Sequence, residues 1–107
     1  MLNEHEVFRA LGVAPAGLLI TGIQTILWGS EIRFVCLYDP DHPRTFRMIF
    51  KDTLSILWEV FDRVDERDTT ADVIGILFDN ENRKCIITTD VFEISVSYGQ
   101  LIFEKDW

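Results

Sequence analysis

The residues best suited to chemistry in this sequence are its two histidines, because histidine is the usual general base near neutral pH. His5 lies among charged residues near the N-terminus, and we expect it on the surface. His42 belongs to a loop in which Asp39, Asp41 and His42 offer oxygen and nitrogen ligands. Their spacing matches no ligand pattern, and two prolines in the same loop explain it as a rigid turn. We therefore predict no metal site.

Covalent catalysis and phosphate binding also lack their usual patterns. The chain has no Gly-x-Ser-x-Gly elbow, and neither Cys36 nor Cys85 lies in a loop beside a histidine. The glycine-containing segment 12–17 follows a predicted helix and precedes a predicted strand, whereas a phosphate site needs a glycine-rich turn leading into a helix. With so many carboxylates, some proximity is expected by chance, so no glycosidase pair can be argued. We expect no enzymatic activity and no cofactor.

Composition limits the classes of partner. The chain has 107 residues, 48% of them hydrophobic and 26% charged, which predicts one globular domain spanning residues 1–107. Eighteen acidic residues against ten basic ones give a formal charge of −8. Such a charge repels nucleic acid and anionic membrane surfaces, and it is compatible with a basic protein partner.

Cysteine usage and the N-terminus predict a cytoplasmic protein. Cys36 and Cys85 each lie within an apolar, strand-like run, where a free cysteine acts as a small hydrophobic residue. The first residues lack the basic and apolar regions of a signal peptide, and no apolar stretch is long enough to span a membrane.

Alternating apolar and polar residues predict most of the secondary structure. The clearest case is Phe92, Ile94, Val96 and Tyr98, which alternate with polar residues at the period of a half-buried strand. Gly22 suggests a bulge or a bend, and the pair Gly29-Ser30 suits a type II′ hairpin turn. Strands are expected at 18–28, 31–38, 45–50, 73–78, 84–89, 92–98 and 101–103.

Two segments need separate treatment. Residues 3–11 predict a short helix, with Asn3 as its N-cap and Gly12 just beyond its end. Residues 52–64 are apolar on nearly all sides, and their spacing matches both a helix and a strand. We favour the strand; a second helix near 53–63 would make the fold α+β.

The elements together predict a mainly β fold. We expect an N-terminal helix followed by a seven- or eight-stranded antiparallel meander, because short connections favour pairing between sequence neighbours. That many strands must curl into a sandwich or a partly open barrel to cover their apolar face.

Candidate partner-binding residues come from tryptophan and from the acidic segment 62–72. Trp107 is the last residue, and Trp28 lies beside the predicted Gly-Ser turn. Asp65, Glu66 and Asp68 would form an acidic docking edge. We expect a non-enzymatic interaction or regulatory module that binds a protein partner or a second copy of itself. The alternative is a β-barrel or sandwich that binds a small apolar ligand.

Overall fold

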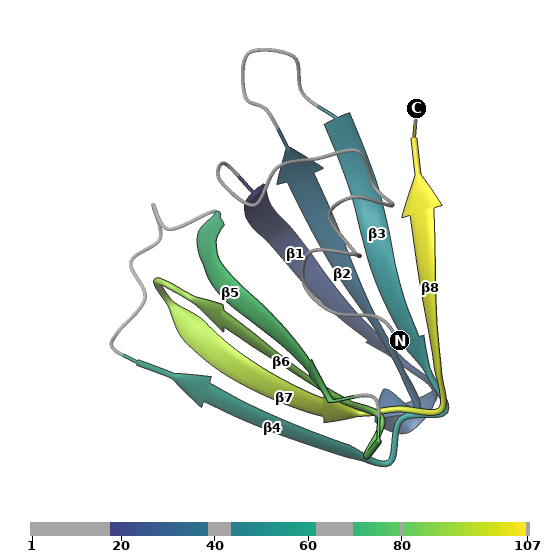
Figure 1. Ribbon diagram of the computed structural model, residues 1–107. Coiled ribbons are helices and arrows are strands. Elements are labelled where there is room, and N and C mark those ends of the chain that lie inside the picture. Colours follow the sequence, from purple (N-terminus) through teal and green to yellow (C-terminus); the bar gives the residue numbers. More distant parts are fainter. Residues whose placement is uncertain (1–17, 39–43, 62–69, 80, 107) are drawn as a thin grey trace.

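The computed structural model describes residues 18–38, 44–61, 70–79 and 81–106, and over these ranges the fold is mainly β, as predicted. Eight antiparallel strands form one open sheet (Figure 1). Their bounds are β1 Leu18–Ile26, β2 Glu31–Tyr38, β3 Arg44–Lys51, β4 Ser55–Val60, β5 Ala71–Asp79, β6 Lys84–Thr89, β7 Phe92–Ser97 and β8 Gln100–Lys105, with a 3-10 turn, η1, at Leu27–Gly29. The helix predicted at 3–11 lies outside the described residues.

The strand order is β4-β7-β6-β5-β1-β2-β3-β8, which corrects the prediction of a simple meander. Two runs, β1-β2-β3 and β5-β6-β7, do pair as sequence neighbours. The fourth and eighth strands do not: β4 pairs with β7, and β8 pairs with β3. The chain crosses from one end of the sheet to the other at the β3–β4 and β7–β8 connections. These two connections meet where the Gly99 N–H donates to the Lys51 carbonyl at 3.0 Å.

The sheet divides into two halves, which we call the β2 half (β1, β2, β3, β8) and the β6 half (β4, β5, β6, β7). Over the described residues, two paired positions join them, Leu19 with Asp72 and Ile20 with Ala71. The register of β1 shifts between Ile20 and Gly22, which is the position where a bulge or bend was predicted. A second shift lies in β5. Bulges bend strands, and the two halves turn toward one another from this junction (Figure 1).

The core lies between the two halves and is built from alternate residues of nearly every strand. Phe92, Ile94 and Val96 are buried, which confirms the alternation predicted for this segment. From the opposite half, Phe34 and Phe50 meet edge to face with ring centroids 5.6 Å apart. The buried apolar residues form one cluster: Leu18, Ile20, Ile32, Phe34, Cys36, Phe46, Met48, Phe50, Ala71, Ile76, Cys85, Ile87, Phe92, Ile94 and Val96.

The ambiguous segment 52–64 contains a strand, β4, as we favoured, and the alternative of a helix there is wrong for residues 55–60. Trp58 pairs with Ile94 and Val60 with Phe92 of β7. The reason is tertiary. One side of β7 is paired with β6, and the segment pairs with the other side whatever the periodicity of its side chains. The hydrogen bonds between the two strands then keep its backbone extended.

Candidate functional site

Among the described strands, β4 is at one edge of the sheet, and its outer side has no paired neighbour. The Phe61 N–H donates to the carbonyl of Val91, the residue just before β7, at 3.0 Å. Backbone groups alternate in direction along a strand, so those of Ile56, Trp58 and Val60 point away from β7. Within the described ranges no strand pairs with that side. These N–H and C=O groups are therefore available to another extended chain.

Apolar side chains flank this edge on both faces of the sheet. Leu57, Trp58 and Val60 are 65%, 50% and 51% exposed, and Phe61 directly follows them at 49%. Glu59 is the one charged residue of the six in β4. Natural edge strands are usually protected by charges, prolines or bulges, because open edges invite pairing with other chains. This strand has little of that protection.

The opposite edge, β8, is different. Its end carries Glu104 and Lys105, and the following residue is Asp106. The Arg47 guanidinium of β3 donates to Glu104 at 3.1 Å and to Asp106 at 2.9 Å. Hydrogen bonds to these two carboxylates raise the pKa of Arg47, which stays a cation. This edge is charged, and its acids are neutralised within the protein.

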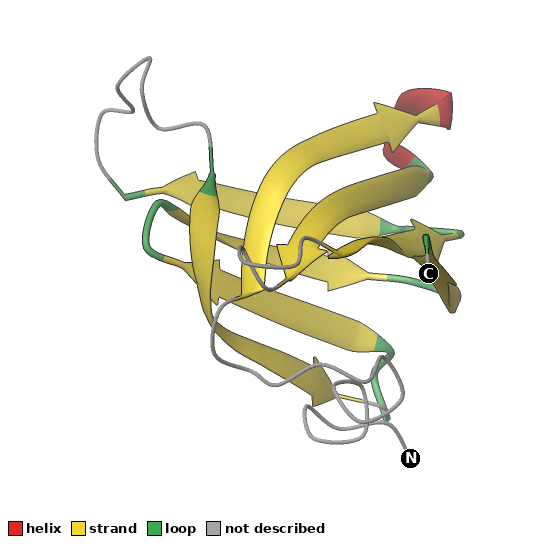
Figure 2. Ribbon diagram, turned by 90° about the horizontal axis from the view of Figure 1, so that it is seen from above, coloured by secondary structure: helices red, strands yellow, loops and turns green. Residues whose placement is uncertain are grey.

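An apolar corner lies at the β1–β2 hairpin, close to the start of β4. Leu27, Trp28 and Leu54 are 69%, 106% and 92% exposed, and all three line one shallow hollow beside Ile56. Figure 2 shows the 3-10 turn of this hairpin projecting from one corner of the molecule. The corner therefore extends the apolar surface of the β4 edge.

The hairpin loop is strained, and the predicted type II′ turn at Gly29-Ser30 is wrong. The last paired residues are Ile26 and Glu31, so the loop has four residues. Leu27, Trp28 and Gly29 have φ angles of 54°, 62° and 93°. Each non-glycine residue in this left-handed region costs about 1–2 kcal/mol.

Hydrogen bonds hold that loop against the β3–β4 connection. The Ser30 hydroxyl donates to the Leu27 carbonyl at 2.7 Å, and the Thr53 hydroxyl donates to the Gly29 carbonyl. The Thr53 N–H also donates to the Ser30 carbonyl at 3.0 Å. This clamp overrides the local preference for a two-residue turn, and it fixes Trp28 pointing into solvent.

Two glutamates stand side by side at the edge. Glu59 of β4 lies directly opposite Glu93 of β7 in the ladder. The Thr88 hydroxyl donates to the Glu93 carboxylate at 3.0 Å. Among the described residues neither glutamate forms an ion pair. Like charges directly opposite one another destabilise a strand pair, so within the described residues the edge carries two carboxylates that no ion pair neutralises.

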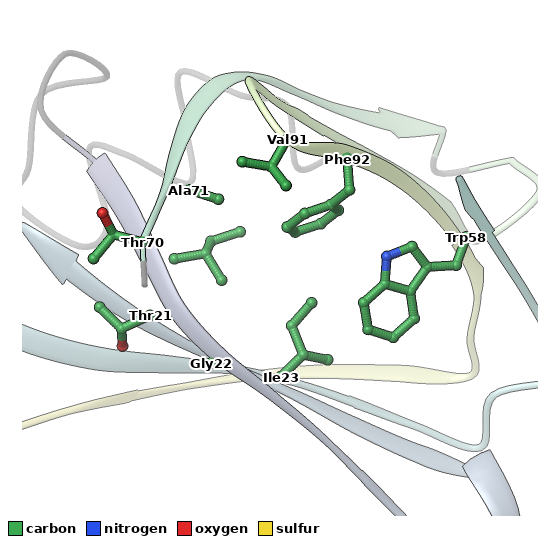
Figure 3. Close-up of a pocket in the computed structure, with 9 residues that line it drawn as sticks. Thr21, Gly22, Ile23, Trp58, Thr70, Ala71, Val91 and Phe92 are labelled. Atoms are coloured by element: carbon green, nitrogen blue, oxygen red, sulfur yellow. The ribbon is translucent and has the colours of Figure 1, made fainter. Parts of the chain in front are cut away.

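A small apolar cleft opens where the two halves separate at β1 and β5. It has a volume of about 250 Å³. Trp58, Val91 and Phe92 point into it from the β6 half, and Ile23 faces them from β1 (Figure 3). The rings of Trp58 and Phe92 lie 5.9 Å apart. The cleft therefore reaches the same strand that forms the open edge.

The described residues offer little reactive chemistry. Burial raises the pKa of both Cys36 and Cys85 to about 12, so each thiol keeps its proton at neutral pH and is a poor nucleophile. No three potential metal-ligating side chains of the described part gather into a cluster. Both His5 and His42 lie outside it. Over the same residues there is no helix with the length and apolarity needed to cross a bilayer.

Of the five residues proposed from sequence for partner binding, the structure describes Trp28, which it places fully exposed at the hairpin tip. Trp107, Asp65, Glu66 and Asp68 lie outside the described residues. Sequence reasoning did not single out Leu54, Leu57 or Trp58. One feature of the sequence could have identified them: residues 54–61 have no polar face. An edge strand with apolar side chains on both faces of the sheet has this pattern.

Comparison with protein-family models, with curated proteins and with solved structures finds no match to this chain.

Proposed function

We propose that this protein is a non-enzymatic interaction module that binds another polypeptide by strand addition to β4. The observation that carries the proposal is the outward-pointing backbone of Ile56, Trp58 and Val60, set between exposed apolar side chains. In strand addition, main-chain hydrogen bonds provide affinity and alternate side chains provide specificity.

The apolar corner supports the same proposal. Leu27, Trp28 and Leu54 together give a partner a hydrophobic contact at one end of the β4 edge. Tryptophan is enriched among residues that dominate binding energy. A backbone strained at Leu27 and Trp28, and clamped in that state, is the kind of outlier that occurs at functional surfaces.

A proline substitution at Val60 tests the proposal. The Val60 N–H points away from β7, so Val60→Pro removes an outward donor and keeps the β7 hydrogen bonds. Lys105→Pro is the matched control on the other edge. The Asp106 N–H donates to Thr45, so the Lys105 N–H also points outward, at the last residue of β8.

Polypeptides captured by the immobilised protein from cells that express it would be identified, produced in pure form and titrated by calorimetry. We expect Val60→Pro to weaken binding at least tenfold and Lys105→Pro to leave it unchanged. Equal affinity for the wild type and both variants would refute docking at β4.

A second function has some support from the cleft. An open curled sheet, which we interpret as a partly open barrel, can hold a small molecule at its mouth. An apolar cavity of about 150 Å³ takes benzene, so the cleft of about 250 Å³ has room for a bicyclic apolar molecule. It is smaller than a typical ligand pocket of about 300–1,000 Å³, which places this function second. Naphthalene titrated against Trp58 fluorescence, with Trp58→Phe as reference, would test it.

A further inference from the structure

We infer that the polypeptide added to β4 carries a lysine or arginine opposite Glu59, between apolar residues. This inference rests on the proposed function and specifies the chemistry of the partner at the same edge. It follows from the charges of the two edges, from the register of β4 and from the poor fit of a second copy.

The first argument is the uncompensated pair. Glu59 and Glu93 face one another across β4 and β7, and the Thr88 hydroxyl donates a hydrogen bond to the Glu93 carboxylate. Lys84 lines the same shallow hollow as the two glutamates, but it forms no ion pair with either. Within the described residues, no cation therefore forms an ion pair with either carboxylate, and Lys84 offsets their repulsion only from a greater distance.

The second argument is the contrast between the edges. At β8, Arg47 binds both Glu104 and Asp106 from the neighbouring strand β3. The protein therefore supplies its own cation to the carboxylates of one edge. At β4, no lysine or arginine of the described residues forms an ion pair with Glu59 or Glu93. The other exposed side chains of this edge are mainly apolar. An incoming strand can supply it.

The third argument is register. Because the N–H and C=O of Glu59 point toward β7, Glu59 is a non-hydrogen-bonded position with respect to a strand on the outer side. If the added strand is antiparallel to β4, residues opposite one another at such positions have Cα atoms about 4.5 Å apart, the closer of the two spacings. A basic side chain opposite Glu59 would lie on the same face as both glutamates and reach them directly.

A second copy of this chain fits less well. A two-fold axis through Trp58 places Glu59 opposite Leu57 of the other copy, and an axis through Glu59 places the two Glu59 residues opposite one another. Neither of these two registers places a described lysine or arginine opposite Glu59. Each copy also carries a net charge of −8, so association between copies works against long-range repulsion, whereas a basic strand is attracted.

Three soluble ten-residue peptides that alternate valine and threonine would serve as probes. They differ at one central position, which holds lysine, glutamine or glutamate. Calorimetric titration into the full chain at low salt would give three dissociation constants. The variants are Glu59→Lys, which reverses the charge at the edge, and Glu81→Lys, which makes the same change in the exposed β5–β6 turn.

We expect the lysine peptide to bind the wild-type protein about two- to tenfold more tightly than the glutamate peptide, as for cross-strand ion pairs. Glu59→Lys should reverse this preference, and Glu81→Lys should preserve it. Near-ultraviolet circular dichroism of both variants would check that they are folded.

The outcomes separate the two proposals. Equal binding of all three peptides would overturn the basic partner and leave docking at β4 standing. Failure of every peptide to bind would overturn both. A dimer in light scattering that Val60→Pro dissociates would also overturn the basic partner, because it would identify a second copy as the occupant.

Discussion

Replacing Thr89 with valine should cost this fold about 3 kcal/mol, although the two side chains have nearly the same shape. Thr89 is fully buried at the end of β6, in the turn that leads to β7. Its hydroxyl donates to the Phe92 carbonyl at 3.0 Å. It also accepts from the N–H groups of Val91 and Phe92, at 3.1 and 2.9 Å.

The magnitude follows from these three bonds. Each hydrogen bond contributes about 0.5–1.5 kcal/mol net, so losing three costs roughly 1.5–4.5 kcal/mol. The substitution also leaves the buried Phe92 N–H without this partner, and an unsatisfied buried donor is costly. We therefore expect a loss near the middle of that range or above. At about 2.1 cal/mol/K of unfolding entropy per residue, 3 kcal/mol in a chain of 107 residues lowers Tm by about 13 °C.

Thermal and urea unfolding, followed by circular dichroism, would measure the change. Two controls isolate the hydroxyl. Thr89→Ser keeps all three bonds and loses one methyl group, at about 1 kcal/mol. Thr88→Val removes a single hydroxyl bond to the carboxylate of Glu93, at about 1.5 kcal/mol, the low end for a bond to a charged group, because this bond is only partly buried.

A Thr89→Val protein no less stable than Thr88→Val would refute the reasoning, because the three bonds would then contribute nothing beyond one partly exposed bond. The result bears on the candidate site as well. β7 begins three residues after Thr89 and carries β4, so a misplaced turn would move the open edge.

Three further perturbations have definite expected outcomes. Gly99→Ala places a Cβ 2.9 Å from the Asp52 Cβ, and we expect a loss of about 1–3 kcal/mol in urea unfolding that Asp52→Gly partly restores; additive losses would contradict this. The raised pKa of Cys36 and Cys85 keeps both thiols protonated in the folded state, so stability should fall as pH rises from about 9 toward 12, where the unfolded state ionises. A Cys36→Ala, Cys85→Ala protein should show a shallower decline in urea midpoint over that pH range, and an unchanged slope would argue against this coupling. Arg47→Met should lower stability slightly at low salt and less at 0.5 M salt (roughly a 4 Å Debye length), because its partners are exposed; a salt-independent loss would point to packing instead.

Strand positions were predictable from sequence because one face of the sheet is buried, so apolar and polar residues alternate along each strand. The expected bounds 31–38 and 84–89 match β2 and β6, and the alternation from Phe92 to Val96 is seen in the core. These segments have neighbours on both sides and one solvated face. Their side-chain pattern therefore reports their surroundings directly.

Strand order was not predictable in the same way. Nothing local in residues 52–54 specifies that the following strand leaves β3 and pairs with β7. That choice depends on the meeting of two connections distant in sequence, at Lys51 and Gly99. The turn type at Gly29 failed for a similar reason, because the Thr53 clamp comes from another part of the chain.

The candidate site was predictable in part. Trp28 was singled out by its place beside a turn, and the structure places it in solvent. The β4 edge was missed because a strand that is apolar on both faces lacks the contrast from which exposure is inferred. Which side of a strand lacks a neighbour is a property of the whole sheet.

The exchange of β4 and β8 makes the two halves interdependent. The outer strand of the β6 half is β4, which follows β3 of the other half in the sequence. The outer strand of the β2 half is β8, which follows β7. Neither half can be excised as an autonomous fragment, because a cut between them leaves each without one of its outer strands. Folding must wait for contacts of long sequence separation, which predicts one cooperative transition and slow kinetics for a chain of this size.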